Sequence, residues 1–228
     1  MFVCSWVHGQ GALGSWNTLH LRYGYSPRLS LFAEVQLRSL RFYHHFHYYE
    51  YKGGFISPIY SNVYAGLGLG KYETYREGGN FVLPKNNSEM RLWSHLSLME
   101  PIGKLKIEQR YRIEMRFTQS GYRNRFRYRL SSAYPFFDSG KGYSLFLLSA
   151  ASEIFFTDKE PYFERHRFNL ALNCRFSPHT SLQVGYLYQF DYRINDEIGT
   201  CFLQVGLFIE LSSKRASFPV LQPEIREN

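Results

Sequence analysis

Arginines at every second position are the residues of this sequence best suited to bind anions. They occur in two neighbouring stretches, KLKIEQRYRIEMRF at residues 104–117 and YRNRFRYRLS at residues 122–131. A guanidinium group presents N–H donors in a planar fork that fits carboxylate and phosphate groups. A spacing of two places such side chains on one face of a β-strand. The candidate anion-attracting residues are Arg110, Arg112, Arg125, Arg127 and Arg129.

Acidic residues on the same face are candidates for local counter-charges, and these are Glu108, Glu114 and Glu153. A short loop joins the two stretches, so we expect them to pair as antiparallel strands. A tight register sets Arg116 opposite Arg123, Glu114 opposite Arg125, Arg112 opposite Arg127, and Arg110 opposite Arg129. Like charges directly opposite each other are destabilising. The excess arginines must therefore face acids across an interior, water with counter-ions, or an anionic solute.

Two other motifs resemble ligand sites but have simpler interpretations. The glycines of AGLGLGK, residues 65–71, lack the spacing and the Ser/Thr end of a nucleotide-binding loop, so we interpret them as small residues on one strand face. His44, His45 and His47 could bind zinc or copper. However, they fall in an expected exposed loop with no acid or thiol nearby, so we interpret them as surface histidines. No metal site and no cofactor is predicted.

The sequence offers little support for an enzyme. Ser94 and His95 are adjacent, so on a strand they point to opposite faces and cannot act together. No G-x-S-x-G motif is present. A nucleic-acid-binding sheet is also disfavoured, because its aromatic and basic residues would share a face, whereas here they alternate between faces. Cys4, Cys174 and Cys201 form no metal-binding spacing and are interpreted as small apolar residues.

The elements that carry these residues are strands, because the dominant hydrophobic period is two. Short turns such as YSPR at 25–28 alternate with more variable connections such as TYREGGNFVLPKNNS at 74–88. Aromatic residues gather near the strand ends. These features are typical of a membrane β-barrel. The expected strands are 15–24, 29–41, 47–56, 62–74, 89–99, 104–117, 122–134, 144–156, 163–176, 181–192 and 200–211.

The number of segments conflicts with a general property of bacterial barrels. Eleven segments can be counted, whereas single-chain bacterial barrels normally have an even number of strands. Either the N-terminal piece adds a partial twelfth strand or one segment does not span. The sequence therefore predicts an all-β, antiparallel, up-and-down transmembrane barrel of ten to twelve strands.

A membrane barrel places its charged face inside and its apolar face toward lipid, and a soluble barrel does the reverse. Residues 104–117 exceed the average soluble strand of about 5–6 residues, which favours the membrane form. The net charge of +8 then becomes a property of the interior. The expected lumenal cations are Arg38, Lys52, Arg91, Lys104, Lys106, Arg110, Arg112, Arg116, Arg123, Arg125, Arg127, Arg129, Arg165 and Arg167. The expected lumenal acids are Glu34, Glu50, Glu89, Glu108, Glu114 and Glu153.

The order and spacing of several loose motifs resemble those of a known family. The motifs are GSWN, RYGYSPRLSLFAEVQLR, LKIEQRYRIEMRF, YRNRFRYRLSSAYP, LSAASEIFF with EPYFERHRF, and LQVGYLYQF, between Gly14 and Leu211. In these the chain resembles the DUF2490 family of predicted Gram-negative outer-membrane β-barrels. The resemblance implies a signal peptide, an outer-membrane location and a barrel, and it brings no catalytic residues.

The chain is therefore expected to have three parts. Residues 1–9 are interpreted as the tail of a signal peptide, residues 10–211 as the barrel and residues 212–228 as a polar tail. The expected function is a narrow, anion-favouring channel for small acidic solutes, surrounded by membrane lipid and not bound to nucleic acid. A closed barrel acting through its loops and a soluble ligand-binding barrel are the alternatives.

Overall fold

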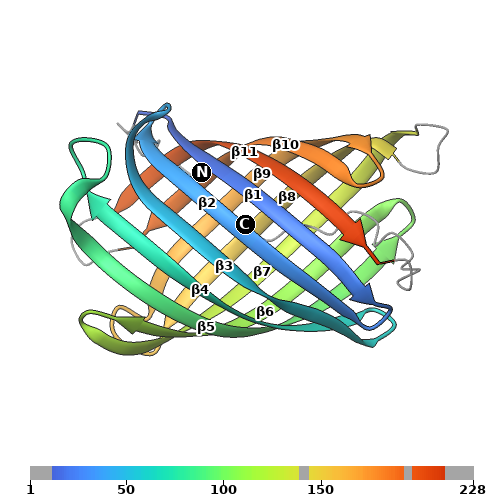
Figure 1. The fold of residues 1–228 in the computed structure, drawn as a ribbon, viewed down its shortest axis with the longest axis horizontal. Helices are drawn as coiled ribbons and strands as arrows, with labels where there is room; N and C mark the ends of the chain where they lie inside the picture. Colours follow the sequence, from blue (N-terminus) through green and yellow to red (C-terminus); the bar gives the residue numbers. More distant parts are fainter. Residues whose placement is uncertain (1–11, 139–143, 193–196, 214–228) are drawn as a thin grey trace, which may run out of the picture.

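The chain folds into one closed barrel of eleven strands, shown by a computed structural model that describes residues 12–138, 144–192 and 197–213. Each strand runs obliquely to the barrel axis, and successive hairpins alternate between the two ends (Figure 1). The strands are β1 Gly14–Ser26, β2 Leu29–Arg41, β3 His44–Tyr60, β4 Val63–Arg76, β5 Val82–Ile102, β6 Leu105–Thr118, β7 Gly121–Asp138, β8 Ser144–Thr157, β9 Phe163–Ser177, β10 Thr180–Asp191 and β11 Ile198–Ser212.

The eleven segments expected from the alternating pattern are all strands. The largest differences lie at β5 and β7, which extend well beyond the expected 89–99 and 122–134. The sequence predicts a loop before Glu89 because these residues include Pro84 and several polar side chains. Pro84 lies where the pairing of β4 with β5 shifts its register, and a sheet tolerates a proline at such an irregularity. The expected long loop at 74–88 is therefore wrong, and the connection covers only residues 77–81.

The barrel closes between its first and last strands, and this pair is parallel. The register runs from Gly14 opposite Phe202 to Gly24 opposite Ser212. All other neighbours are antiparallel, so the expectation of a purely antiparallel barrel is wrong at this one seam. An odd number of alternating strands requires one parallel pair, so no segment fails to span. The possible twelfth strand falls on residues 1–11, outside the described residues.

The two faces of the wall are those of a membrane barrel. Charged and polar side chains are buried inside, for example Glu34, Glu114 and Arg110, each with at most 2% of its surface exposed. Leucine, isoleucine, valine and aromatic side chains alternate with them and are exposed on the outer wall. This pattern is the reverse of that in a soluble barrel. In the described part of the chain, no helix is long and apolar enough to cross a membrane.

Polar side chains on the outer wall satisfy one another. The Oε1 atom of Gln109, the one polar residue on the apolar face of β6, accepts hydrogen bonds from the hydroxyls of Tyr111 at 3.4 Å and Tyr128 at 3.2 Å. Ser152 and His166 are paired in a similar way at 2.9 Å. A polar group facing lipid without a partner costs several kcal/mol, roughly, and such pairs remove that cost.

The glycines of β4 leave room for two lumenal rings. A Cβ atom built on Gly68 would lie 2.4 Å from the Trp93 ring, and one on Gly66 would lie 2.2 Å from the His95 ring. The interpretation of these glycines as small residues on a strand face is therefore confirmed. Ser94 is exposed on the outer wall while His95 is buried in the lumen, so these two residues point to opposite faces.

The histidine cluster lies elsewhere than expected. The turn between β2 and β3 is confined to Phe42 and Tyr43, and β3 begins at His44. The histidines are therefore strand residues and not loop residues. Cys174 and Cys201 are free thiols on the wall, and Cys4 lies outside the described residues.

Candidate functional site

The candidate arginines lie together on the lumenal face of β6 and β7. The register places Arg110 opposite Arg129, Arg112 opposite Arg127, Glu114 opposite Arg125, and Arg116 opposite Arg123, so the predicted pairing is confirmed. Lys104 is the exception among the expected lumenal cations, because it is exposed in the turn before β6. The exposed fractions of Arg110, Arg112, Arg125, Arg127 and Arg129 range from 2% to 9%. Buried cations at this density need carboxylates close by.

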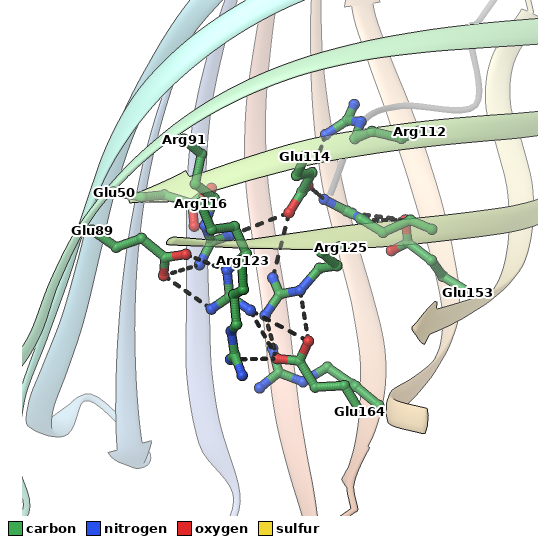
Figure 2. Close-up of polar contacts among 12 residues, drawn as sticks. Glu50, Glu89, Arg91, Arg112, Glu114, Arg116, Arg123, Arg125, Glu153 and Glu164 are labelled. Atoms are coloured by element: carbon green, nitrogen blue, oxygen red, sulfur yellow. Dashed lines mark hydrogen bonds and ion pairs between the residues drawn. The ribbon is translucent and has the colours of Figure 1, made fainter. Parts of the chain in front are cut away.

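Glu114 is the central carboxylate of this array. It is fully buried and accepts hydrogen bonds from Arg127 at 2.5 Å and Arg125 at 3.4 Å. Its oxygens also lie 3.9 Å from a guanidinium nitrogen of Arg91 and 4.0 Å from one of Arg112 (Figure 2). One acid from β6 thus contacts arginines from three strands.

Acids from flanking strands provide further counter-charge. Glu153 of β8 accepts hydrogen bonds from Arg127 at 2.7 and 3.0 Å and lies 3.8 Å from Arg110. Glu89 of β5 accepts hydrogen bonds from Arg116 and, at 2.8 Å, from Arg91. The sequence left open whether the excess arginines face acids, counter-ions or a solute, and the structure places acids beside several of them.

Glu164 is a member of this network that the alternating pattern could not identify. Phe155 pairs with Arg165 and Phe156 with Phe163, so Glu164 is an extra residue in β9 without a partner in β8. Such a bulge re-aims a side chain. The Glu164 carboxylate accepts hydrogen bonds from Arg125 and Arg116, and it lies 3.7 Å from Arg123 (Figure 2). Simple alternation would have placed this carboxylate on the lipid side.

Part of the Arg129 guanidinium makes no hydrogen bond within the described residues. Its Nε and Nη1 atoms are buried and make no hydrogen bond within the part of the chain that the structure describes. The residue pairs across β7 and β8 with Glu153. The hydroxyl of Ser131, two residues further along the same lumenal face, is also buried without a hydrogen-bond partner among the described residues. These groups can donate hydrogen bonds to an anion.

Aromatic rings and arginines together narrow the lumen beside this array. The Arg38 guanidinium lies 3.3 Å from the centre of the Trp16 ring and 4.0 Å from that of Tyr48. Arg167 lies 4.9 Å from the Trp16 ring and 4.8 Å from the Phe155 ring, which links β1 to β8 through β9. Cation–π contacts of this kind stabilise an arginine away from water.

A cavity of about 340 Å³ opens at the end of the barrel where the longer loops lie. We call this cavity the vestibule. Its cationic lining residues are Arg38, Lys52, Arg91, Arg116, Arg125, Arg127, Arg165 and Arg167. Its acidic lining residues are Glu50, Glu77, Glu89, Glu164 and Asp191. Positive side chains therefore outnumber negative ones in the vestibule, and Arg125 and Arg127 of the candidate set contribute to it.

A metal centre finds no support in this geometry. Within the described ranges, no three His, Cys, Asp or Glu side chains are placed to hold a metal ion.

Comparisons with known proteins agree with this architecture. A family model described as "Protein of unknown function (DUF2490)" matches residues 13–199. Among solved structures, the chain is similar to the NanC porin, with a TM-score of 0.53 and 12% sequence identity over 88% of this chain and 100% of that one. At this level of identity the likeness concerns the fold. No curated protein matches the sequence.

Proposed function

This chain belongs to the DUF2490 family, whose function is unknown, and we propose that it is a narrow, anion-favouring channel of the bacterial outer membrane. A transmembrane barrel with short turns at one end and longer loops at the other is the architecture of outer-membrane proteins. The porin-like fold is consistent with that location. The proposed solutes are small anions that carry a carboxylate or phosphate group.

The observation that carries the proposal is the excess of guanidinium groups over carboxylates around the vestibule. Charged rings set ion selectivity in pores. An anion entering from the longer-loop end first meets the vestibule and then the ladder on β6 and β7. The unpartnered Nε and Nη1 atoms of Arg129 offer it donors without displacing a carboxylate.

The proposed mechanism is partner exchange. Glu114 and Glu153 hold Arg127 in its position, and each of these acids also lies near other arginines. A solute carboxylate can replace a protein carboxylate at one arginine while the remaining contacts keep the side chain extended. Binding that is shared among several sites allows an ion to enter and also to leave.

The test is the reversal potential of the purified chain in a planar lipid bilayer under a salt gradient. We expect an anion-selective sign. Replacement of Arg129 by Gln should lower the anion preference by up to about fivefold, because a unit charge 4 Å away in water contributes about 1 kcal/mol. Arg28→Gln, in the exposed β1–β2 turn, is the matched control and should leave selectivity unchanged. A cation-selective reversal potential in the native chain would contradict the proposal.

A closed, non-conducting barrel is the second candidate, and the close ion pairing favours it. Glu34, Glu50 and Lys52 are all at least 92% buried, and the Lys52 ammonium lies 2.6 Å from Glu34 and 3.0 Å from Glu50. Such a network fills the interior with satisfied charges. A folded, membrane-inserted chain that gives no current under any salt gradient would select this candidate, with the longer loops as its interaction surface.

A further inference from the structure

The outer wall carries a hollow that the lumenal function does not use. It has a volume of about 490 Å³ and lies over β1 to β5. Its floor and sides include Leu21, Ala33, Gly53 and Leu69. All four side-chain positions face outward, where the wall meets lipid, so we call this feature the outer groove.

The strand register explains why the groove exists. Leu21 lies opposite Ala33, Ala33 opposite Gly53, and Gly53 opposite Leu69, so these residues form one row across four strands. The two central positions have a methyl group or no side chain at all. The next row toward the longer loops contains larger side chains, with Val35 opposite Tyr51 and Tyr51 opposite Lys71.

The row on the other side of the groove is also bulky. Leu31 lies opposite Phe55, and Phe55 lies opposite Leu67. Bulky side chains therefore flank the two small central positions, Ala33 and Gly53, on both sides. The result is a trough between two ridges, and its width is set by a single row of the sheet. An extended hydrocarbon chain is the ligand whose cross-section and polarity match such a trough.

A cationic cluster lies at the β4 side of the groove. The ammonium of Lys71, which lines the groove, is 3.6 Å from the Glu73 carboxylate, and the ammonium of Lys85 is 3.2 Å from the other oxygen of the same carboxylate. Two ammonium groups thus share one acid, which leaves an excess positive charge. The Lys71 and Lys85 side chains keep 31% and 34% of their surface exposed, so both can meet a further anion.

The cluster lies at the level expected for lipid headgroups. Tyr49, Tyr75 and Phe81 form a group of rings directly beyond it, with centroids 5.2 to 6.1 Å apart. Lys85 lies 5.5 Å from the centre of the Tyr75 ring. Tyrosines in membrane barrels gather at the membrane–water interface. Lys71 follows the apolar groove residues and directs its ammonium toward that interface, as snorkelling lysines do.

We propose that the outer groove binds the lipid A part of one lipopolysaccharide molecule, with an acyl chain in the groove and a phosphate on Lys71 and Lys85. This assignment rests on the proposed outer-membrane location, in which the longer-loop end faces the exterior and its outer leaflet. Lipid A combines phosphate groups with several acyl chains, which matches the paired ammonium groups and the adjoining trough.

The experiment is native mass spectrometry of the detergent-solubilised full chain titrated with lipid A. The double variant Lys71→Gln/Lys85→Gln should weaken binding by about fivefold for each lysine removed. Ala33→Leu fills the groove from the lipid side and should also weaken binding. The matched controls are Lys104→Gln, in the β5–β6 turn at the other end of the barrel, and Ala150→Leu, on the outer wall of β8. Both controls should bind as the native chain does.

Several outcomes would overturn the assignment. If the native chain and the double lysine variant bind lipid A with equal affinity, the lysines do not contact its phosphate. If the Ala33→Leu variant binds as tightly as the native chain, the groove does not hold an acyl chain. Phosphatidylglycerol binding as tightly as lipid A would show a general site for anionic lipids. The heat-modifiable gel shift of each variant verifies that it is folded. Because the assay uses purified protein without current or fractionation, its result is independent of whether the channel conducts or where it resides.

Discussion

At the scale of single residues, Glu164 has a large effect on the electrostatics of the lumen. It contacts three arginines from two strands, and only a bulge in β9 turns it inward. A guanidinium that loses its carboxylate in a poorly solvated site keeps its desolvation cost and loses the compensating attraction. The bulge therefore determines whether this end of the arginine array is stable.

Glu164→Gln tests this view. We expect a loss of about 3 kcal/mol in the free energy of unfolding, because removing one partner of a buried ion pair costs roughly that amount. Urea titration in detergent micelles measures it. Glu160→Gln, in the exposed loop just before β9, is the control for the charge change alone and should unfold like the native chain. An unchanged midpoint for Glu164→Gln would mean that water and ions already screen these arginines.

Gln109 also supplies a partner to neighbouring polar groups, on the side of the wall that faces lipid. Gln109→Leu should destabilise the barrel by about 1 kcal/mol although it makes the surface more apolar, because the Tyr111 and Tyr128 hydroxyls lose their acceptor. Adding Tyr111→Phe and Tyr128→Phe should restore most of the loss. If the single variant is as stable as the native chain, the two hydroxyls have reached other partners. The unfolding midpoints of the native chain, Gln109→Leu, the pair Tyr111→Phe/Tyr128→Phe and all three changes together measure these effects.

At the scale of elements, β4 and β5 fit together because one strand lacks side chains where the other has rings. The middle of the lumenal face of β4 is formed by Gly66, Gly68 and Gly70, and the Trp93 and His95 rings of β5 lie over Gly68 and Gly66. The absence of side chains on β4 thus allows large ones on β5 within the same cross-section of the lumen.

Gly68→Ala tests this complementarity. A methyl group there would lie 2.4 Å from Trp93, so we expect overpacking to cost about 1–3 kcal/mol. Trp93→Leu should compensate in the double variant because it removes the ring that clashes. The fraction of heat-modifiable, folded protein after refolding measures both effects. Equal yields for Gly68→Ala alone and the native chain would show that the ring can move away.

The existence and order of the strands could be predicted from the sequence because a period of two is a local signal. The pairing of β6 with β7 could also be predicted, since a short loop fixes the register of a hairpin. The inward turn of Glu164, the strand character of residues 82–88 and the position of Lys104 in a turn could not. Each depends on a register shift or a hairpin boundary, which tertiary pairing sets and alternation does not reveal.

Some partners of the arginines could not be predicted from the sequence either. Glu114 and Glu153 share a lumenal face with the arginines in any alternating arrangement. Contacts across the lumen, such as Arg167 over the Trp16 ring, depend on the diameter and closure of the barrel. Closure involves β1 and β11, which are the most distant strands in the sequence.

At the scale of the whole molecule, the inverted arrangement of polar and apolar faces determines where the chain can reside. The exposed apolar wall needs lipid around it. We expect the chain to sediment with the outer-membrane fraction and to run on a gel as a folded band that shifts to the position of the unfolded chain on boiling. Recovery of folded chain from the soluble periplasmic fraction without detergent would contradict this expectation. A known soluble periplasmic protein serves as the control for leakage between fractions.

The parallel pair of β1 and β11 also gives the molecule a direction. Gly14 lies at the end of the barrel with the longer loops, and Ser212 lies at the end with the short turns. An even number of crossings returns a chain to the side on which it started, whereas eleven crossings do not. Gly14 and Ser212 therefore lie at opposite ends of the barrel, so the wall of eleven strands is one covalent connection between its two rims.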